Sequence, residues 1–265
     1  MFTDTHAHLY HHQFAHDREA MVKRAMDAGV TRLLLPNVDH DTIDVMHALC
    51  DAHPTVCYPM MGLHPCHVGA DNADAMEEVE RLLRSRWYCA VGEIGIDLYW
   101  DKSFLAQQQE VFRQQVRWGK ELGLPIAIHC RESFAETIAI VEEENDERLR
   151  GVFHCFTGTV EHAARVIGLG DFYLGIGGVV TYPKGGLAGT MAVVGPEHCV
   201  LETDAPYLAP VPFRGKRNES SYIPHIAEKL ALATGRSVEE VARITTANAS
   251  ALFNRIPAPT EATNA

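Results

Sequence analysis

Histidine, glutamate and aspartate residues end or follow several apolar, strand-like segments of this sequence. The first segment, "FTDTHAH", carries Asp4, His6 and His8 at alternate positions. Alternate residues of a β-strand point to the same side, so the two imidazoles can reach one metal ion. Four further residues of metal-binding type close other apolar runs: Glu93, His129, His154 and Asp204. Together these residues predict a metal site assembled from several strand ends.

The number and type of these side chains indicate two metal ions. Four imidazoles and two carboxylates exceed what one tetrahedral ion needs when a water is also bound. A carboxylate can bridge two ions about 3.5–4 Å apart, and Glu93, from the fourth predicted strand, is the expected bridge. The identity of the divalent ions stays open between zinc, manganese, magnesium and similar cations, since imidazoles suit transition metals and magnesium prefers oxygen.

The elements that must position these residues alternate regularly between strand and helix. The helical segments carry apolar residues at three- and four-residue spacing, and the last one begins at a capping box of Ser237 and Glu240. Eight such units in about 250 residues predict an α/β fold, the (β/α)8 TIM-type barrel, whose active site lies at the C-terminal ends of the strands. A doubly wound sheet is the alternative, but no GxGxxG follows the first strand. The predicted strands are 2–8, 31–36, 56–61, 88–93, 125–129, 151–155, 172–176 and 199–204.

Composition and segment order predict a single domain. Of the 265 residues, 46% are hydrophobic, and no linker-like stretch divides the chain. We therefore expect one barrel over 1–255 and a frayed, polar C-terminal tail over 256–265. No apolar run approaches about 18 residues, and no basic stretch followed by an apolar one opens the chain. We expect no membrane segment and no signal peptide.

Charge and cysteine content bear on the cellular location of the protein and on the kind of nucleic-acid-binding protein it can be. The seven cysteines form no CxxC pair, which favours a reducing, cytoplasmic location over a disulfide framework. The net charge of −12 argues against a protein that coats nucleic acid non-specifically. It leaves room for an enzyme with a local basic patch beside its active site.

The ordered motifs of the chain resemble the TatD family of metal-dependent deoxyribonucleases, which lies within the amidohydrolase-like barrels. The resemblance runs from residue 1 to 255 and implies a TIM-type barrel, a divalent-metal centre and phosphodiester hydrolysis on DNA. It also implies 3′–5′ exonuclease activity on single strands, without an obligate protein partner. The matching segments are "TDTHAHL", "GLHP", "VGEIGID", "IHCR", "FHCFTG", "LETDAPYL" and "PFRGKRNES". The family's metal ligands fall on His6, His8, Glu93, His129, His154 and Asp204.

Asp204 and Glu93 are the expected catalytic residues. Asp204 is the candidate that accepts a proton from the attacking water while touching one metal. Asp4 and Glu202 share faces with candidate ligands but lie deeper in the barrel. We expect these two acids to orient metal-binding histidines.

Residues for substrate binding are expected at the same end of the barrel. His64, in "GLHP", follows the third strand and can donate to a phosphate oxygen. Arg131 lies two residues beyond His129 and suits bidentate phosphate contact. The dense basic cluster of the chain, after the eighth strand, comprises Arg214, Lys216 and Arg217.

Two aromatic residues, Tyr99 and Trp100, follow the strand of Glu93. They can stack on a nucleobase, or simply pack the loop. The sequence does not decide between these roles.

Fold and metal ligation alone do not fix a substrate. A metal-dependent phosphatase, or an ester deacylase of the aminoacyl-tRNA type, is the enzymatic alternative. A metal-stabilised barrel that serves only as an interaction module is the alternative without catalysis.

Overall fold

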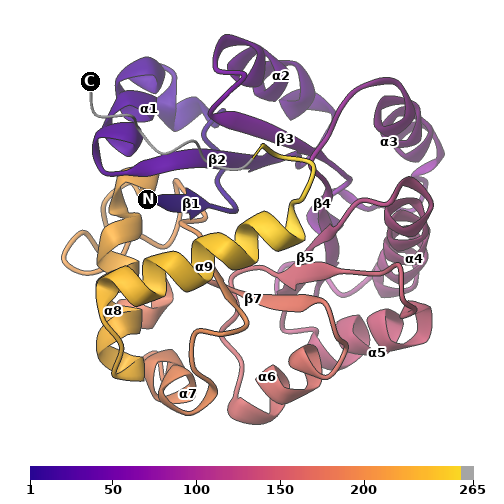
Figure 1. Cartoon of the computed structure of the whole chain (residues 1–265). Coiled ribbons are helices and arrows are strands. Elements are labelled where there is room, and N and C mark those ends of the chain that lie inside the picture. Colours follow the sequence, from indigo (N-terminus) through magenta and orange to yellow (C-terminus); the bar gives the residue numbers. More distant parts are fainter. Residues whose placement is uncertain (258–265) are drawn as a thin grey trace.

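Eight parallel strands lie side by side in sequence order, from β1 to β8 (Figure 1). The computed structural model describes residues 1–257. The N–H of Thr5 donates to the carbonyl of Leu201 at 3.0 Å, which brings the first strand segment back to the last. The predicted (β/α)8 barrel is therefore confirmed. The strands are β1 (Phe2–Asp4), β2 (Val30–Pro36), β3 (Cys57–Met61), β4 (Ala90–Asp97), β5 (Ile126–Arg131), β6 (Gly151–Phe153), β7 (Phe172–Ile176) and β8 (Cys199–Leu201).

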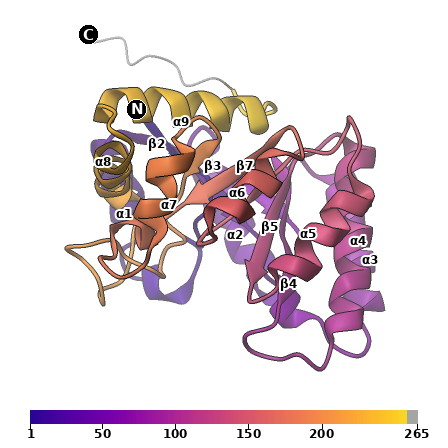
Figure 2. The ribbon, with the colours of Figure 1, turned by 90° about the horizontal axis from the view of Figure 1, so that it is seen from below.

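Helices connect the strands and form the outer layer (Figures 1 and 2). Among the described helices, none combines the length and apolar character that a membrane span requires. The α-helices are α1 (Arg18–Asp27), α2 (Ile43–Ala52), α3 (Ala73–Ser85), α4 (Leu105–Leu122), α5 (Phe134–Glu144), α6 (Val160–Ile167), α7 (Leu187–Val194), α8 (Ile223–Thr234) and α9 (Val238–Leu252). Short 3-10 helices are η1 (His12–Phe14), η2 (His40–Thr42), η3 (Pro65–His67), η4 (Gly178–Thr181) and η5 (Ser220–Tyr222).

Helix α9 closes the end of the barrel at which the strands begin (Figure 2). A cluster of buried residues inside the barrel includes Leu34 and Met60 from the strands, and Leu252 and Phe253 from the end of α9. A larger apolar cluster fills the space between the strands and the outer helices. With one end sealed by α9, only the C-terminal ends of the strands are left to surround a site.

Both ends of α9 are well defined. The Ser237 hydroxyl accepts from the N–H of Glu240, whose carboxylate accepts from the N–H of Ser237, so the predicted capping box is confirmed. Beyond the helix, Ile256 is buried against the cluster inside the barrel. The rest of the tail expected over 256–265 lies outside the described residues from 258 onward.

Several strands end elsewhere than predicted. Strand β1 stops at Asp4, so His6 and His8 lie on an extended segment after it and not within it. This segment bonds alternately to its two neighbours, since Thr5 donates to Leu201 and Ala7 donates to the Leu34 carbonyl at 3.1 Å. It is thereby held where the barrel closes, without forming a regular ladder on either side.

Strand β4 extends beyond its predicted C-terminal end, whereas strand β8 stops before its predicted end. Strand β4 runs to Asp97, which places Glu93 in its middle. Strand β8 stops at Leu201, so Asp204 lies in the following loop, with a left-handed φ of 57°. Apolar pattern alone predicts neither end, because both are set by pairing with neighbouring strands.

Close contact between β4 and β5 requires a glycine at position 95. Gly95 has a φ of 144°, and a Cβ atom there would lie 2.0 Å from the carbonyl oxygen of His129. The pairing register between the two strands also shifts between Val91 and Ile94. The missing side chain lets the strand that carries Glu93 approach the strand that carries His129.

We predict that Gly95→Ala lowers the free energy of unfolding by about 3 kcal/mol or more, because it combines a backbone clash with a strained φ. Urea unfolding followed by circular dichroism measures this loss. Gly69→Ala is the matched control, since a Cβ atom at Gly69 meets nothing within 4 Å. Equal unfolding midpoints for the two variants would contradict the prediction.

Candidate metal centre

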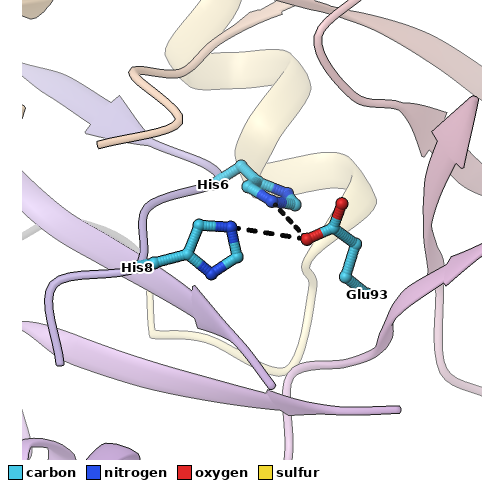
Figure 3. Close-up of side chains that lie close together, drawn as sticks. All are labelled: His6, His8 and Glu93. Carbon is cyan, nitrogen blue, oxygen red and sulfur yellow. Dashed lines mark hydrogen bonds and ion pairs between the residues drawn. The ribbon is translucent and has the colours of Figure 1, made fainter. Parts of the chain in front are cut away.

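The buried carboxylate of Glu93 lies at the centre of a histidine cluster. Its Oε2 atom is 3.1 Å from Nε2 of His6 and 3.4 Å from Nε2 of His8 (Figure 3). Asp204 adds a second carboxylate on this side, with Oδ1 3.4 Å from Nε2 of His8. We call this group the first ligand set: His6, His8, Asp204 and Oε2 of Glu93.

The other oxygen of Glu93 faces a separate group. Oε1 is 2.8 Å from Nδ1 of His129, 2.8 Å from Nε2 of His154 and 3.3 Å from Nε2 of His64. We call His129, His154, His64 and Oε1 of Glu93 the second ligand set. The two oxygens of this one carboxylate are therefore directed at different groups of imidazoles.

Donor atoms from both sets come close enough together for a cation, although His154 groups with His6 and Glu202 and not with His64 and His129. The ligand atoms of His6, His8 and Glu93 all lie within 4.8 Å of one another, as do those of His64, Glu93 and His129. Imidazole nitrogens also approach each other, with Nδ1 of His129 only 3.3 Å from Nε2 of His154. Nitrogens and carboxylate oxygens that converge this closely are the donors that zinc-type and manganese-type ions bind. The site can therefore bind metal.

The charges in the cluster are strongly coupled. Burial alone would raise the pKa of Glu93, but the imidazoles of His154, His64 and His6 outweigh it and hold that pKa well below its usual range. Burial likewise opposes protonation of His129, yet hydrogen bonds with Asp97 and Glu93 raise its pKa. Without a cation, protons on imidazoles balance the carboxylates. Metal binding would therefore displace protons.

Asp97 holds His129 in place, a role that the sequence prediction missed. Its Oδ2 atom is 2.8 Å from Nε2 of His129, the ring nitrogen that faces away from Glu93. Carboxylates in this position fix the tautomer and orientation of metal-binding histidines. Asp97 lies four residues after Glu93 on β4, and this even spacing predicts a shared face.

Tyr10 does the same for His8. Its hydroxyl is 2.9 Å from Nδ1 of His8 and donates to the carbonyl of Pro36 at 2.5 Å. Tyr10 is buried, so this bond fixes the ring against β2. It follows His8 by two residues, the same spacing that linked His6 to His8.

The two deeper acids behave differently from each other. Asp4 accepts from the backbone N–H of Thr203 at 2.9 Å and from its hydroxyl at 2.6 Å, and it also accepts from the backbone N–H of His6 at 3.3 Å. Within residues 1–257 its carboxylate bonds to no histidine ring, so Asp4 supports His6 through the backbone and not through the imidazole as expected. It also fixes the loop that leads to Asp204, and burial raises its pKa to about 7. Glu202 accepts from the N–H of Cys155 at 2.5 Å and lies 3.6 Å from Nδ1 of His154, close to the expected role.

The sequence matches a protein-family model over nearly its whole length. The family model described as TatD related DNase matches residues 3–254. This chain belongs to that family. The expectation of a hydrolytic enzyme of the TatD type is confirmed.

Relatives and solved structures agree with this assignment. An uncharacterized metal-dependent hydrolase, YabD of Bacillus subtilis, is 38% identical over 96% of this chain and 99% of its own length. A protein of Pantoea ananatis named 3′-5′ ssDNA/RNA exonuclease TatD is 35% identical over 92% of this chain and 96% of its own. The crystal structure of YjjV, a TatD homologue from Escherichia coli K12, superposes with a TM-score of 0.89 at 29% identity, covering 96% of this chain and 98% of that one.

The expected substrate-binding residues of this TatD-family chain fall into two groups. Arg131 is exposed, and its guanidinium lies 3.8 Å from the ring centre of Tyr99. Among residues 1–257, neither Arg214 nor Lys216 pairs with a carboxylate; Arg214 lies 4.6 Å over the ring of Tyr182. These three cations are free to meet an anion.

Arg217 and His64 are placed differently. Both terminal nitrogens of Arg217 donate to Asp17, each at 2.7 Å, and its guanidinium lies 4.5 Å over the ring of Phe14. Arg217 therefore anchors the basic loop to the segment before α1. His64 belongs to the second ligand set by geometry, where burial lowers its pKa to about 4. It is neutral at pH 7.

We predict that Asp97→Asn weakens divalent-metal binding about 10–100-fold, because the amide holds His129 less well in the tautomer that a cation needs. Equilibrium dialysis against zinc or manganese, with elemental analysis of the protein, measures the change. Asp101→Asn is the control on the same loop, since the Asp101 carboxylate bonds only to the nearby Ser103. Unchanged affinity in Asp97→Asn would show that His129 does not depend on this contact.

Proposed function

We propose that this TatD-family protein is a divalent-metal-dependent nuclease that hydrolyses phosphodiester bonds of single-stranded DNA from the 3′ end. The observation that carries the proposal is the shared carboxylate of Glu93, with one oxygen toward each ligand set. The Pantoea ananatis relative, named 3′-5′ ssDNA/RNA exonuclease TatD, supports the single-stranded substrate and the polarity. The family match favours this activity over a phosphatase, an ester deacylase or a non-catalytic module.

The division of the donors into two ligand sets supports two bound ions. Glu93 would bridge them through its two oxygens. Bound divalent ions supply Lewis acidity, which acidifies a water and polarises the phosphoryl group. The first ion would be held by His6, His8 and Asp204, and the second by His129 and His154.

Asp204 is placed to act as the base. Burial alone would raise its pKa, but the contacts with His8 and the charges of His154 and His6 keep that pKa below its usual value. The carboxylate is therefore ionised at neutral pH and able to accept a proton from the attacking water. Asp204 adopts a left-handed backbone, a conformation that Asp tolerates better than most residues, and this backbone directs its carboxylate toward His8.

The remaining residues would hold the substrate. Arg131, Arg214 and Lys216 offer cations to the phosphates of a strand that crosses the mouth of the barrel. His64, neutral at pH 7, would act as a hydrogen-bond donor or ligand and not as a cation. This local positive group makes the net charge of −12 compatible with a polyanionic substrate.

We further propose a cytoplasmic location. All seven cysteines are free, although Cys50, Cys57, Cys89 and Cys199 are buried. An odd set of unpaired thiols suits a reducing compartment.

We predict that Asp204→Asn lowers the rate of cleavage of end-labelled single-stranded DNA by about 10²–10⁴-fold, because the amide accepts no proton. The amide oxygen still reaches the first ligand set, so most of the bound metal should remain, as elemental analysis would show. Asp171→Asn is the control, since Asp171 is exposed and precedes β7 at the other end of the barrel. Cleavage by Asp204→Asn at the wild-type rate would remove Asp204 as the base.

A further inference from the structure

Two aromatic rings and a guanidinium form a compact exposed cluster beside the metal centre. Trp100 is 70% exposed and Tyr99 is 48% exposed, and both follow the end of β4. The rings meet edge to face, with centroids 4.9 Å apart and an interplanar angle of 87°. The Arg131 guanidinium lies 3.8 Å from the Tyr99 ring centre and 5.5 Å from that of Trp100. We call Tyr99, Trp100 and Arg131 the aromatic–arginine cluster.

Asp97 ties this cluster to the candidate ligands. Its Oδ1 atom accepts from the backbone N–H of Tyr99 at 2.9 Å and of Trp100 at 3.2 Å. Its Oδ2 atom contacts Nε2 of His129. Asp97 is buried, so one rigid side chain fixes both the aromatic loop and a metal-type imidazole. The exposed rings are therefore held in a defined place relative to the second ligand set.

The chemistry of the cluster suits a nucleotide. Within residues 1–257, the Arg131 guanidinium forms no ion pair and no hydrogen bond, whereas Arg217 is bound by Asp17 and lies 3.6 Å from Glu219. A free guanidinium recognises a phosphate, and a flat exposed ring stacks on a base. Arg131 covers one face of Tyr99, so Trp100 presents the more open ring.

We infer that Trp100 is the stacking platform for a nucleobase next to the scissile phosphate, with Arg131 bound to an adjoining phosphate. The inference rests on the proposed nuclease function and names a subsite for it. A base in a duplex is held by its pairing partner and its stacked neighbours, whereas an unpaired terminal base can rotate to lay its face on a protein ring. Stacking on Trp100 thus selects for single strands.

The test combines a protein variant with a change in substrate. The measured quantity is kcat/KM of the metal-loaded enzyme on an end-labelled oligothymidylate, and on the same strand with abasic residues at its two 3′-terminal positions. Removing the bases should lower kcat/KM of the wild-type enzyme about tenfold. For Trp100→Ala, kcat/KM on the intact strand should be about tenfold lower than for the wild-type enzyme. This variant should cleave the abasic strand with the same kcat/KM as the intact strand. Trp100→Phe should retain most of the wild-type preference for the intact strand over the abasic strand, because a ring that can stack remains.

Trp87→Ala is the matched control. Trp87 is also an exposed tryptophan, 44% accessible, but it precedes β4 at the opposite end of the barrel. It should discriminate between the two strands as the wild-type enzyme does.

The possible results distinguish a failure of the proposed stacking subsite from a failure of the proposed nuclease function. A wild-type enzyme that cleaves both strands equally well overturns the subsite and leaves the nuclease intact. Equal losses on both strands in Trp100→Ala also overturn it, since they indicate a purely structural role. A wild-type enzyme that cleaves neither strand with any divalent metal contradicts the proposed function itself.

Discussion

The structure depends on one buried carboxylate surrounded by imidazoles. Glu93 is 2% exposed, and an ionised group at such depth is stable only when opposite charge or a cation meets it. The barrel provides this from several strand ends, because residues as distant in sequence as His6 and His154 converge on the two oxygens of Glu93. The narrow strand spacing at Gly95 and the supports of Asp97 and Tyr10 all follow from the need to place these rings accurately.

One end of the barrel contributes mainly to stability, and the other end carries the residues that can do chemistry. At one end, α9 inserts Leu252 and Phe253 against the barrel interior and leaves an apolar plug. At the other end, ring nitrogens, carboxylates and unpaired cations gather around the mouth. This separation lets the loops after the strands vary in chemistry, while the sealed end maintains the fold.

The sequence predicted the fold, the eight strands and the residue types at their ends, because strong alternation and apolar runs are local signals. It could not predict where β1, β4 and β8 end, because those ends depend on pairing across the sheet. It predicted that Asp4 supports a histidine, which Asp4 does through the backbone N–H of His6, but it could not predict the second partner of that carboxylate, Thr203, 199 residues away in the chain. The sequence could not predict the ion pair between Arg217 and Asp17 either, because these residues lie 200 positions apart in the chain.

The proposed role of Glu93 as a bridge between two cations is tested most directly by metal stoichiometry measured together with cleavage. The wild-type protein, loaded in turn with zinc, manganese, cobalt and magnesium, is compared with Glu93→Gln by elemental analysis and on end-labelled single-stranded DNA. If Glu93 bridges two cations, the wild-type protein binds two ions and cleaves with at least one metal, and a folded Glu93→Gln loses both properties. A Glu93→Gln variant that retains two ions and wild-type cleavage would contradict it.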